Sequence, residues 1–270
     1  MATLAGAHAE RVMRVRDLQT VKGRKEQRRF VLEGPTLLDE ARRSGLAIEE
    51  LYVSEAVLAN NAAVRELDHK GTPVYVVDER TLRKISDLET PTGLVAVAGQ
   101  QLADIDAVLR GPLTLVLADL NDPGNVGTLL RSAEAFGASG AILGRLGVDP
   151  YHPKVVRAAM GSTFRLPVAL ASAPEFAQAA ARSGAAVIGL APAGVPLGQI
   201  ERGPALALVV GHERRGLGLW EFPGIRLVGI PMHGAVESLN ASVAGSIALY
   251  ALAERCQESP GGLKSQDYRP

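Results

Sequence analysis

Apolar residues in the first half of the chain fall into short runs that are separated by amphipathic segments. Four of these runs predict strands, and the segments at 35–45 and 81–88 predict helices between them. The first helix has a proline in its first turn and a glycine where it ends, as is typical of helix boundaries. The predicted strands are 30–34, 51–54, 73–78 and 93–98. Residues 30–98 are therefore predicted to form a small α/β domain.

From residue 113 onward the apolar runs are continuous. Such runs, bounded by turn residues, are typical of strands that are buried on both faces of a parallel sheet. Helical segments lie between several of them, which makes the fold class α/β. The predicted strands are 113–120, 140–144, 185–191, 205–211 and 225–231, and the predicted helices are 125–138, 152–162, 175–184 and 241–256. We expect a larger second domain over 113–270 and a linker at 99–112.

The charge distribution adds a third segment to this picture. The chain has 270 residues and no formal net charge, but eight Lys and Arg residues and only two acids lie between residues 11 and 29. Such a cluster attracts phosphate backbones. A solvated, partly helical tail explains the cluster equally well. We define residues 1–29 as a basic N-terminal arm.

Cysteine and histidine usage excludes several kinds of site. Cys256 is the only cysteine, so neither an intramolecular disulfide nor a multi-cysteine metal site can form. The five histidines lack the spacing of a zinc motif, and no metal is expected. The sequence has no run of eighteen apolar residues and no signal-peptide core, which predicts a cytoplasmic location without a membrane partner. Phosphate-loop, G-x-G-x-x-G and G-x-S-x-G motifs are absent as well.

Three of the predicted strands run into polar loops, and ligands of open α/β sheets bind beyond the carboxyl ends of strands. In the first loop, Arg131 lies on a helix whose side chains lean back toward the loop, which indicates an anionic ligand. The second loop contains Glu213, and the third contains Ser238 and Asn240 before a helix. The loops belong to the segments 115–137, 205–217 and 225–256. Singly, each can also be a turn, a helix cap or a surface charge.

Together the three loops resemble the SpoU/TrmH family of RNA methyltransferases, within the SPOUT class. The resemblance rests on N-x-P-G-N-x-G-T-x-x-R-S-A-x-A-F-G at 121–137, VVGHERRGL at 209–217, IPMHGAVESLNASVA at 230–244 and GSTFRLPV at 161–168. Residues 30–98 resemble the RNA-binding substrate domain of larger members. The resemblance implies a parallel C-terminal sheet with a deep trefoil knot, S-adenosylmethionine as cofactor, and a homodimer to which the helix of small residues at 240–256 contributes.

The activity implied by this resemblance is methyl transfer to an RNA ribose 2′-hydroxyl. The implied catalytic residues are Asn125, Arg131, Glu213, Ser238 and Asn240, and the cofactor would lie against the backbone of Gly211, Ile230 and Leu239. Arg131 is either a general base or a charged clamp that stabilises the developing alkoxide, because an arginine loses its proton only at high cost. Arg214 departs from the small residue that is usual in the family and adds a candidate RNA contact.

The N-terminal half indicates the kind of RNA. An RNA-binding domain with a basic arm suits a large structured RNA, so we expect ribosomal RNA, most specifically 23S rRNA, with transfer RNA as the alternative. The predicted RNA contacts are Arg24, Lys25, Arg28, Arg29 and Arg165. A non-catalytic RNA-binding or ribosome-assembly protein on the same fold is a second hypothesis. A nucleotide-binding oxidoreductase is a third, and the missing glycine motif disfavours it.

Overall fold

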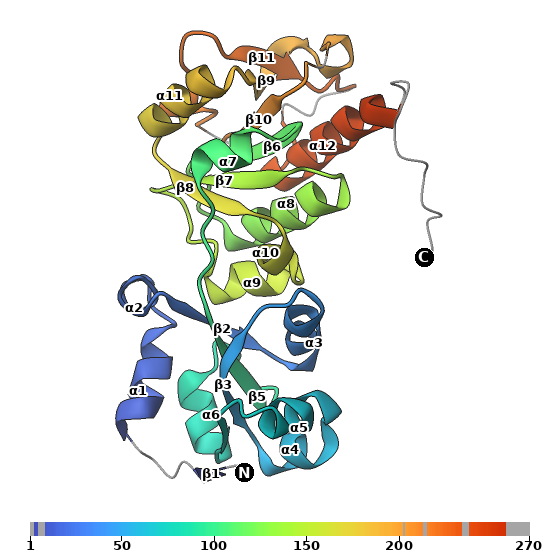
Figure 1. Ribbon diagram of the computed structural model, residues 1–270. Helices are drawn as coiled ribbons and strands as arrows, with labels where there is room; N and C mark the ends of the chain where they lie inside the picture. The colour runs from blue at the N-terminus through green and yellow to red at the C-terminus, as the bar shows by residue number, and fades with distance from the viewer. Residues whose placement is uncertain (1–2, 5–8, 202, 213–214, 234–237, 258–270) are drawn as a thin grey trace. The chain divides into compact units, whose positions relative to one another are not determined.

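The computed structural model describes residues 3–4, 9–201, 203–212, 215–233 and 238–257 (Figure 1). Contacts between residues divide the chain into two compact units. The first unit contains residues 1–102 and 149–165, and the second contains 103–148 and 166–270. Residues 149–165 lie between two strands of the second unit in sequence, so the first unit is assembled from two separate stretches of chain.

The first unit is built on a mixed five-stranded sheet with the strand order β1-β4-β3-β5-β2. Strand β3 pairs parallel with β4, whereas β5 pairs antiparallel with both β2 and β3. The strands are β1 (Thr3–Leu4), β2 (Arg29–Glu33), β3 (Ile48–Val53), β4 (Val74–Val76) and β5 (Leu94–Gly99). The helices are α1 (Ala9–Asp17), α2 (Val21–Gln27), α3 (Pro35–Arg43), α4 (Glu55–Asn60), α5 (Ala62–His69), α6 (Glu79–Ile85), α9 (Pro153–Ala159) and α10 (Ser162–Arg165). The predicted strands and the two predicted helices of residues 30–98 are confirmed, but α4 and α5 were not predicted.

The segment that we expected to be a basic arm is folded from residue 9 onward. Val12 and Val15 on α1, and Leu18 after it, are buried in one core cluster with Tyr52 and Tyr75 of the sheet. Their spacing of three residues places them on one side of a helical segment. Six of the eight basic residues are therefore carried by the helices α1 and α2, and the segment is part of the first unit.

Residues 149–165 also belong to the first unit. The ring of Tyr151 lies 4.7 Å from the ring of Phe30 in β2, and Asp149 accepts a hydrogen bond from Arg24 at 2.7 Å. The sequence placed this stretch within the larger second domain, 113–270. Its contacts correct that boundary, because an aromatic pair and an ion pair hold it to the N-terminal sheet.

The second unit is a six-stranded sheet in which every pairing is parallel, with the order β11-β9-β10-β6-β7-β8. The strands are β6 (Leu113–Leu117), β7 (Gly140–Gly144), β8 (Val168–Ala171), β9 (Ala186–Pro196), β10 (Leu206–Val210) and β11 (Arg226–Gly229). Its helices are α7 (Ile105–Leu109), α8 (Pro123–Ala135), α11 (Ala173–Ser183) and α12 (Ala241–Gln257), with short 3-10 turns η1 (Leu197–Gln199) and η2 (Gly218–Trp220). The α/β class and the parallel sheet are confirmed, β8 was not predicted, and the trefoil knot stays a prediction.

The central strands explain why the continuous apolar runs were informative. Every residue of β6, β7 and β10 is buried, as is typical of strands covered on both faces. Because the strands are parallel, the segments that follow them leave the sheet at one edge. The described part of the chain contains no helix that is long and apolar enough to cross a membrane.

Candidate active site

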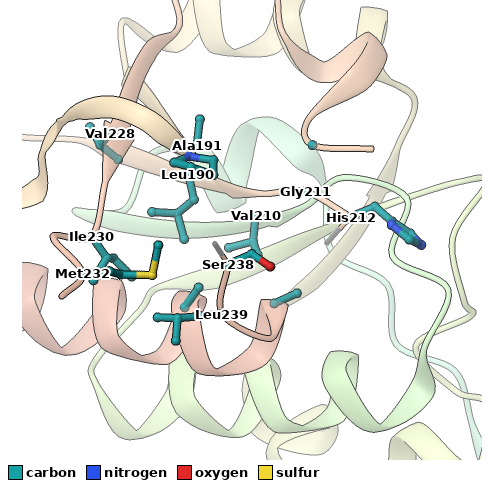
Figure 2. A pocket seen from close by; sticks show the side chains of 14 residues that line it. Leu190, Ala191, Val210, Gly211, His212, Val228, Ile230, Met232, Ser238 and Leu239 are labelled. Atoms are coloured by element: carbon teal, nitrogen blue, oxygen red, sulfur yellow. The ribbon is translucent and has the colours of Figure 1, made fainter. Parts of the chain in front are cut away.

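A pocket lies where strands of the second unit end (Figure 2). Its lining comes from four segments, namely 190–192 of β9, 210–216 after β10, 228–232 at the end of β11, and 238–244 at the start of α12. Figure 2 shows Leu190, Ile230 and Leu239 together on one side of the pocket, whereas His212 lies on the other. The pocket therefore combines an apolar slot with a more polar side.

The residues that were predicted to hold the cofactor meet in this pocket. Gly211, Ile230 and Leu239 all line it, and so does Ser238, which was predicted to be catalytic. None of the lining residues in the described part of the chain is a lysine or an arginine. An apolar slot edged by backbone groups and free of cationic side chains suits an adenine ring and a positively charged sulfonium. The residues present thus fit S-adenosylmethionine.

The second polar loop is a tight turn at the edge of the pocket. The backbone N–H of His212 donates to the carbonyl of Gly216 at 2.9 Å, and the N–H of Gly216 donates back at 2.8 Å. Both residues line the pocket. Glu213 and Arg214 lie outside the described residues, so the predicted roles of both stay predictions.

The first and third loops meet through two asparagines. Asn240 Nδ2 donates to Asn125 Oδ1 at 3.1 Å, although 115 positions separate these residues in the sequence. Asn240 Oδ1 also accepts from the N–H of Ser242 at 2.9 Å and thereby caps α12. Asp122 Oδ1 accepts from the N–H of Asn125 at 2.7 Å and caps α8. From the sequence alone, Asp122 and Asn240 can be explained as helix caps. In the structure they also bring the side-chain amides of Asn125 and Asn240 into contact.

Close packing of α8 against α12 makes this contact possible. A Cβ on Gly245 would lie 2.4 Å from Leu129 Cδ2, so any larger residue there would require the Leu129 side chain to move. At the next residue of α12, the hydroxyl of Ser246 lies 2.7 Å from that of Ser132 on α8. From the sequence, the small residues of α12 could belong either to a tight core or to a subunit interface. In the structure Gly245 and Ser246 pack within the core, against α8.

Arg131 lies on α8, six positions after Asn125, and is exposed. The pocket lining does not include it. Its guanidinium is accessible from solvent, which is required of a group that contacts an RNA phosphate or the reacting ribose. The position is compatible with both roles that the sequence left open.

The predicted RNA contacts have different environments. Lys25 on α2 and Arg28 after it are exposed. Arg29 pairs with Glu49 and Glu50 at 2.5 and 2.6 Å. Arg165 Nη1 pairs with Glu40 at 2.6 Å. Lys25 and Arg28 are thus the more accessible candidates, because the other two already neutralise carboxylates.

For Arg24 the structure corrects the prediction. Its side chain is 0% exposed, and its Nε lies 2.7 Å from Asp149 Oδ2. Its Nη1 donates to the carbonyl oxygens of Leu18 and Gln19 at 2.9 and 3.1 Å. A guanidinium that is fully buried and committed to these acceptors has no surface to offer to RNA. Arg24 is a structural residue of the first unit.

Two parts of the pocket were missed by the sequence analysis. Met232 and the segment 190–192 contribute to the lining. The apolar run at 185–191 predicted only a strand, and the strand β9 continues to Pro196, so no feature of this run indicated that residues 190–192 border a pocket.

Two family models match the chain. Residues 112–250 match the SpoU rRNA methylase family, and residues 9–96 match the MRM3-like substrate binding domain. The chain belongs to the SpoU rRNA methylase family. The second match begins at α1, in agreement with the folded state of the segment that we had treated as an arm.

Relatives of this SpoU family member are similar over nearly its whole length. It is 29% identical to the 23S rRNA (guanosine(2553)-2′-O)-methyltransferase RlmP of Bacillus subtilis, over 93% of this chain and 99% of the relative. The AdoMet-bound rRNA methyltransferase of Sinorhizobium meliloti matches with a TM-score of 0.81 and 30% identity, over 94% of this chain and 97% of that one. AviRb of Streptomyces viridochromogenes, solved in complex with AdoMet, matches with a TM-score of 0.80 and 26% identity, over 91% and 97%.

Asn240→Asp is expected to separate the two contacts of Asn240 in this SpoU family member. The aspartate retains the oxygen that caps α12, and Asp is as good a cap as Asn, so the melting temperature should change little. It cannot donate to Asn125, and methyl transfer should fall by about tenfold or more. Thermal unfolding and a methylation assay on rRNA check both parts. Asn240→Ala, which loses the cap as well, should reduce both stability and activity, and equal activity of Asn240→Asp and the native protein would contradict the expectation.

Proposed function

We propose that the protein transfers a methyl group from S-adenosylmethionine to a ribose 2′-hydroxyl of ribosomal RNA, most specifically 23S rRNA. The observation that carries this proposal is the pocket in which Gly211, Ile230, Leu239 and Ser238 meet, beside the contact of Asn125 with Asn240. The names of the Bacillus relative and of the AdoMet-bound structures support the same substrate class and cofactor. The single cysteine suits a reducing compartment, and we propose the cytoplasm as the location.

In this proposal the chain's own residues bind and orient two substrates. S-adenosylmethionine, when bound, would supply an electrophilic methyl group to the 2′-oxygen in an in-line displacement, with cleavage of the sulfur–methyl bond and S-adenosylhomocysteine as the neutral leaving group. Leu190, Ile230 and Leu239 hold the apolar part of the cofactor, and the backbone of Gly211 borders it. Ser238, Asn125 and Asn240 orient the ribose, and Glu213 is proposed to orient Arg131. Arg131 either accepts the proton of the 2′-hydroxyl or stays charged and stabilises the alkoxide.

The experiment that tests this function maps ribose methylation. 2′-O-methylated nucleotides are mapped in rRNA and tRNA from cells that carry the native gene, an inactive variant or no gene. We expect one ribose methylation in 23S rRNA that depends on the native gene. A gene-dependent methyl group found only on a base atom, or only in tRNA, would contradict the proposed acceptor or the proposed RNA. Failure of S-adenosylmethionine to bind in isothermal titration would instead support the non-catalytic RNA-binding hypothesis.

We also propose that the protein acts as a homodimer through α12. Val243, Ile247 and Tyr250 are 47%, 41% and 48% exposed, and their spacing of four and three residues places them on one face of the helix. An apolar stripe of this kind on the outside of a helix is typical of an interface. The stripe borders the face of α12 that packs on α8, because Tyr250 lies one turn after Ser246 and its ring is 5.5 Å from the ring of Phe136 at the end of α8.

Val243→Arg is expected to weaken this dimer, because a charge would be buried in an apolar interface. The dimer dissociation constant should rise by at least about a hundredfold, which corresponds to about 2.7 kcal/mol. Sedimentation equilibrium over a range of concentrations measures it. Val21→Arg is the matched control, since Val21 is also 47% exposed but lies on α2 in the other unit. A native protein that is monomeric at micromolar concentration would contradict the proposed dimer.

A further inference from the structure

Asp119 is the residue at which the first polar loop leaves the sheet, and its backbone is unusual. Its φ angle is +50°, a left-handed conformation that side chains other than glycine, Asn and Asp seldom adopt. The N–H of Ala118 before it still donates to the carbonyl of Val210 in β10 at 2.9 Å. Asp119 is therefore the hinge between the buried sheet and the loop that leads to Asn125.

The carboxylate of Asp119 joins three segments that leave the same edge of the sheet. Its Oδ2 accepts from the indole Nε1 of Trp220 at 2.7 Å, and Trp220 lies in η2, after the second polar loop. Its Oδ1 accepts from the backbone N–H of Leu146, in the turn after β7, at 3.1 Å. The segments that follow β6, β7 and β10 are thus tied together by one side chain.

The turn after β7 is shaped around this side chain. A Cβ on Gly144 would lie 2.1 Å from Asp119 Oδ1, and a Cβ on Gly147 would lie 2.8 Å from the carbonyl oxygen of Leu120. The N–H of Val148 donates to the same carbonyl at 2.8 Å. Gly144 and Gly147 therefore allow the turn after β7 to pack closely against residues 119 and 120. This packing holds the start of the first polar loop in place.

The need of the buried Trp220 indole for a hydrogen-bond acceptor explains only part of the contacts of Asp119. Trp220 is 1% exposed and its ring lies 5.7 Å from the ring of Phe176, so its N–H needs an acceptor. That acceptor stands on the loop in which Asp122 caps α8 and Asn125 contacts Asn240. Only the five residues 120–124 separate Asp119 from Asn125. A displacement of Asp119 is therefore expected to displace the side-chain amide of Asn125, which we place at the ribose.

We propose that Asp119 is a positioning residue for methyl transfer, whose carboxylate holds Trp220 and Leu146 so that the loop 120–124 presents Asn125 correctly to the ribose. The inference rests on the proposed function, because Asn125 acts on the ribose only there. Neither Asp119 nor any residue of the loop 120–124 lines the cofactor pocket. His212 and Gly216, which line it and precede Trp220 in the chain, are held by their own pair of backbone hydrogen bonds. Loss of the Asp119 contacts is therefore expected to reduce methyl transfer and to leave cofactor binding largely in place.

Asp119→Gly separates the contacts from the backbone strain. Glycine adopts a φ of +50° without strain but removes both acceptors. Turnover at saturating S-adenosylmethionine and rRNA should fall by about tenfold to a hundredfold, the loss expected from a small misplacement of a catalytic group. The dissociation constant of S-adenosylmethionine, from isothermal titration, should change by less than about threefold.

Three further variants give the expected order of effects. Asp119→Asn retains one acceptor oxygen and should recover part of the turnover, whereas Trp220→Phe removes only one donor and should have an intermediate effect. Asp106→Asn is the control, because it neutralises a partly exposed aspartate of the same unit, which pairs with Arg182 at 2.9 Å. We expect native turnover for this control.

Two outcomes would overturn the proposal. Native turnover in Asp119→Gly is one, and a parallel loss of cofactor affinity and turnover is the other, because a purely structural role predicts it. The side-chain amide resonance of Asn125, observed by NMR, should shift in Asp119→Gly but not in Asp106→Asn, and an unchanged resonance would also overturn the proposal. If the native protein transfers no methyl group, the proposed function fails, whereas this resonance still tests whether Asp119 positions Asn125.

Discussion

Replacing Arg131 with alanine is expected to lower the turnover of rRNA methylation by about 10²–10³-fold, the loss that follows removal of a group stabilising charge in a transition state. Arg131 is exposed on α8 and does not line the cofactor pocket. The affinity for S-adenosylmethionine should therefore change by less than about threefold. Single-turnover transfer of labelled methyl to isolated rRNA measures the first quantity, and isothermal titration measures the second.

The control for Arg131 is another exposed arginine of the same unit. Arg182 pairs with Asp106 on α7, and Arg182→Ala should retain native turnover. A turnover in Arg131→Ala within about threefold of the native value would remove Arg131 from the mechanism.

Arg131→Lys distinguishes the two roles that remain for this residue. A lysine has a lower pKa than an arginine. If residue 131 is the general base, the rate in this variant should rise log-linearly with pH until the lysine has lost its proton. If it is a charged clamp, the variant should show a large loss and a flat profile. A rate measured across the alkaline range therefore decides between the two.

Replacing Arg24 with methionine is expected to destabilise the first unit by about 3–5 kcal/mol, the cost of breaking a buried ion pair from one side. The substitution leaves Asp149, whose side chain is only 15% exposed, without its partner at 2.7 Å. It also removes the donor to the carbonyl of Leu18. Urea unfolding, followed through a probe in the first unit, measures the loss. The pKa of His152, which burial and then the charge of Arg24 hold below its usual value, should rise.

Two variants show whether this loss comes from the ion pair. Lys25→Met changes the exposed neighbour of Arg24 and should alter stability by less than about 0.5 kcal/mol. Adding Asp149→Asn to Arg24→Met should restore part of the stability, because removing a whole buried pair costs less than removing one partner. Equal destabilisation by Lys25→Met and Arg24→Met would contradict the assignment of Arg24 to the core.

Local pattern predicted most of the second unit. The run at 140–144 is the strand β7 at the predicted boundaries, because a strand that is buried on both faces must be apolar throughout. The strand β8 was not predicted, because a segment of four residues is too short to show a hydrophobic period. The polar loops were found because they interrupt apolar runs at strand ends, but their cap residues have local explanations that a single segment cannot exclude.

The folded state of residues 9–29 and the contacts of residues 149–165 with the first unit were not predicted, for a different reason. Arg24 and Lys25 are adjacent cations in the sequence, yet one is buried against Asp149 and the other is exposed. The partner of Arg24 is 125 positions away. A pattern of neighbouring residues carries no information about a partner so far away in the sequence. The same contact helps to hold residues 149–165 in the first unit.

The α/β class, the parallel sheet and the three polar segments that carry the family resemblance could all be predicted from the sequence, because each depends on residue types at short spacing. Only the three-dimensional structure showed that residues 190–192 and Met232 line the same pocket as Gly211, Ile230 and Leu239, that Asn240 donates to Asn125, and that Asp119 accepts from Trp220. The physical reason is that backbone propensity and amphipathic period act over a few residues, whereas packing brings together side chains that the chain separates by a hundred positions or more.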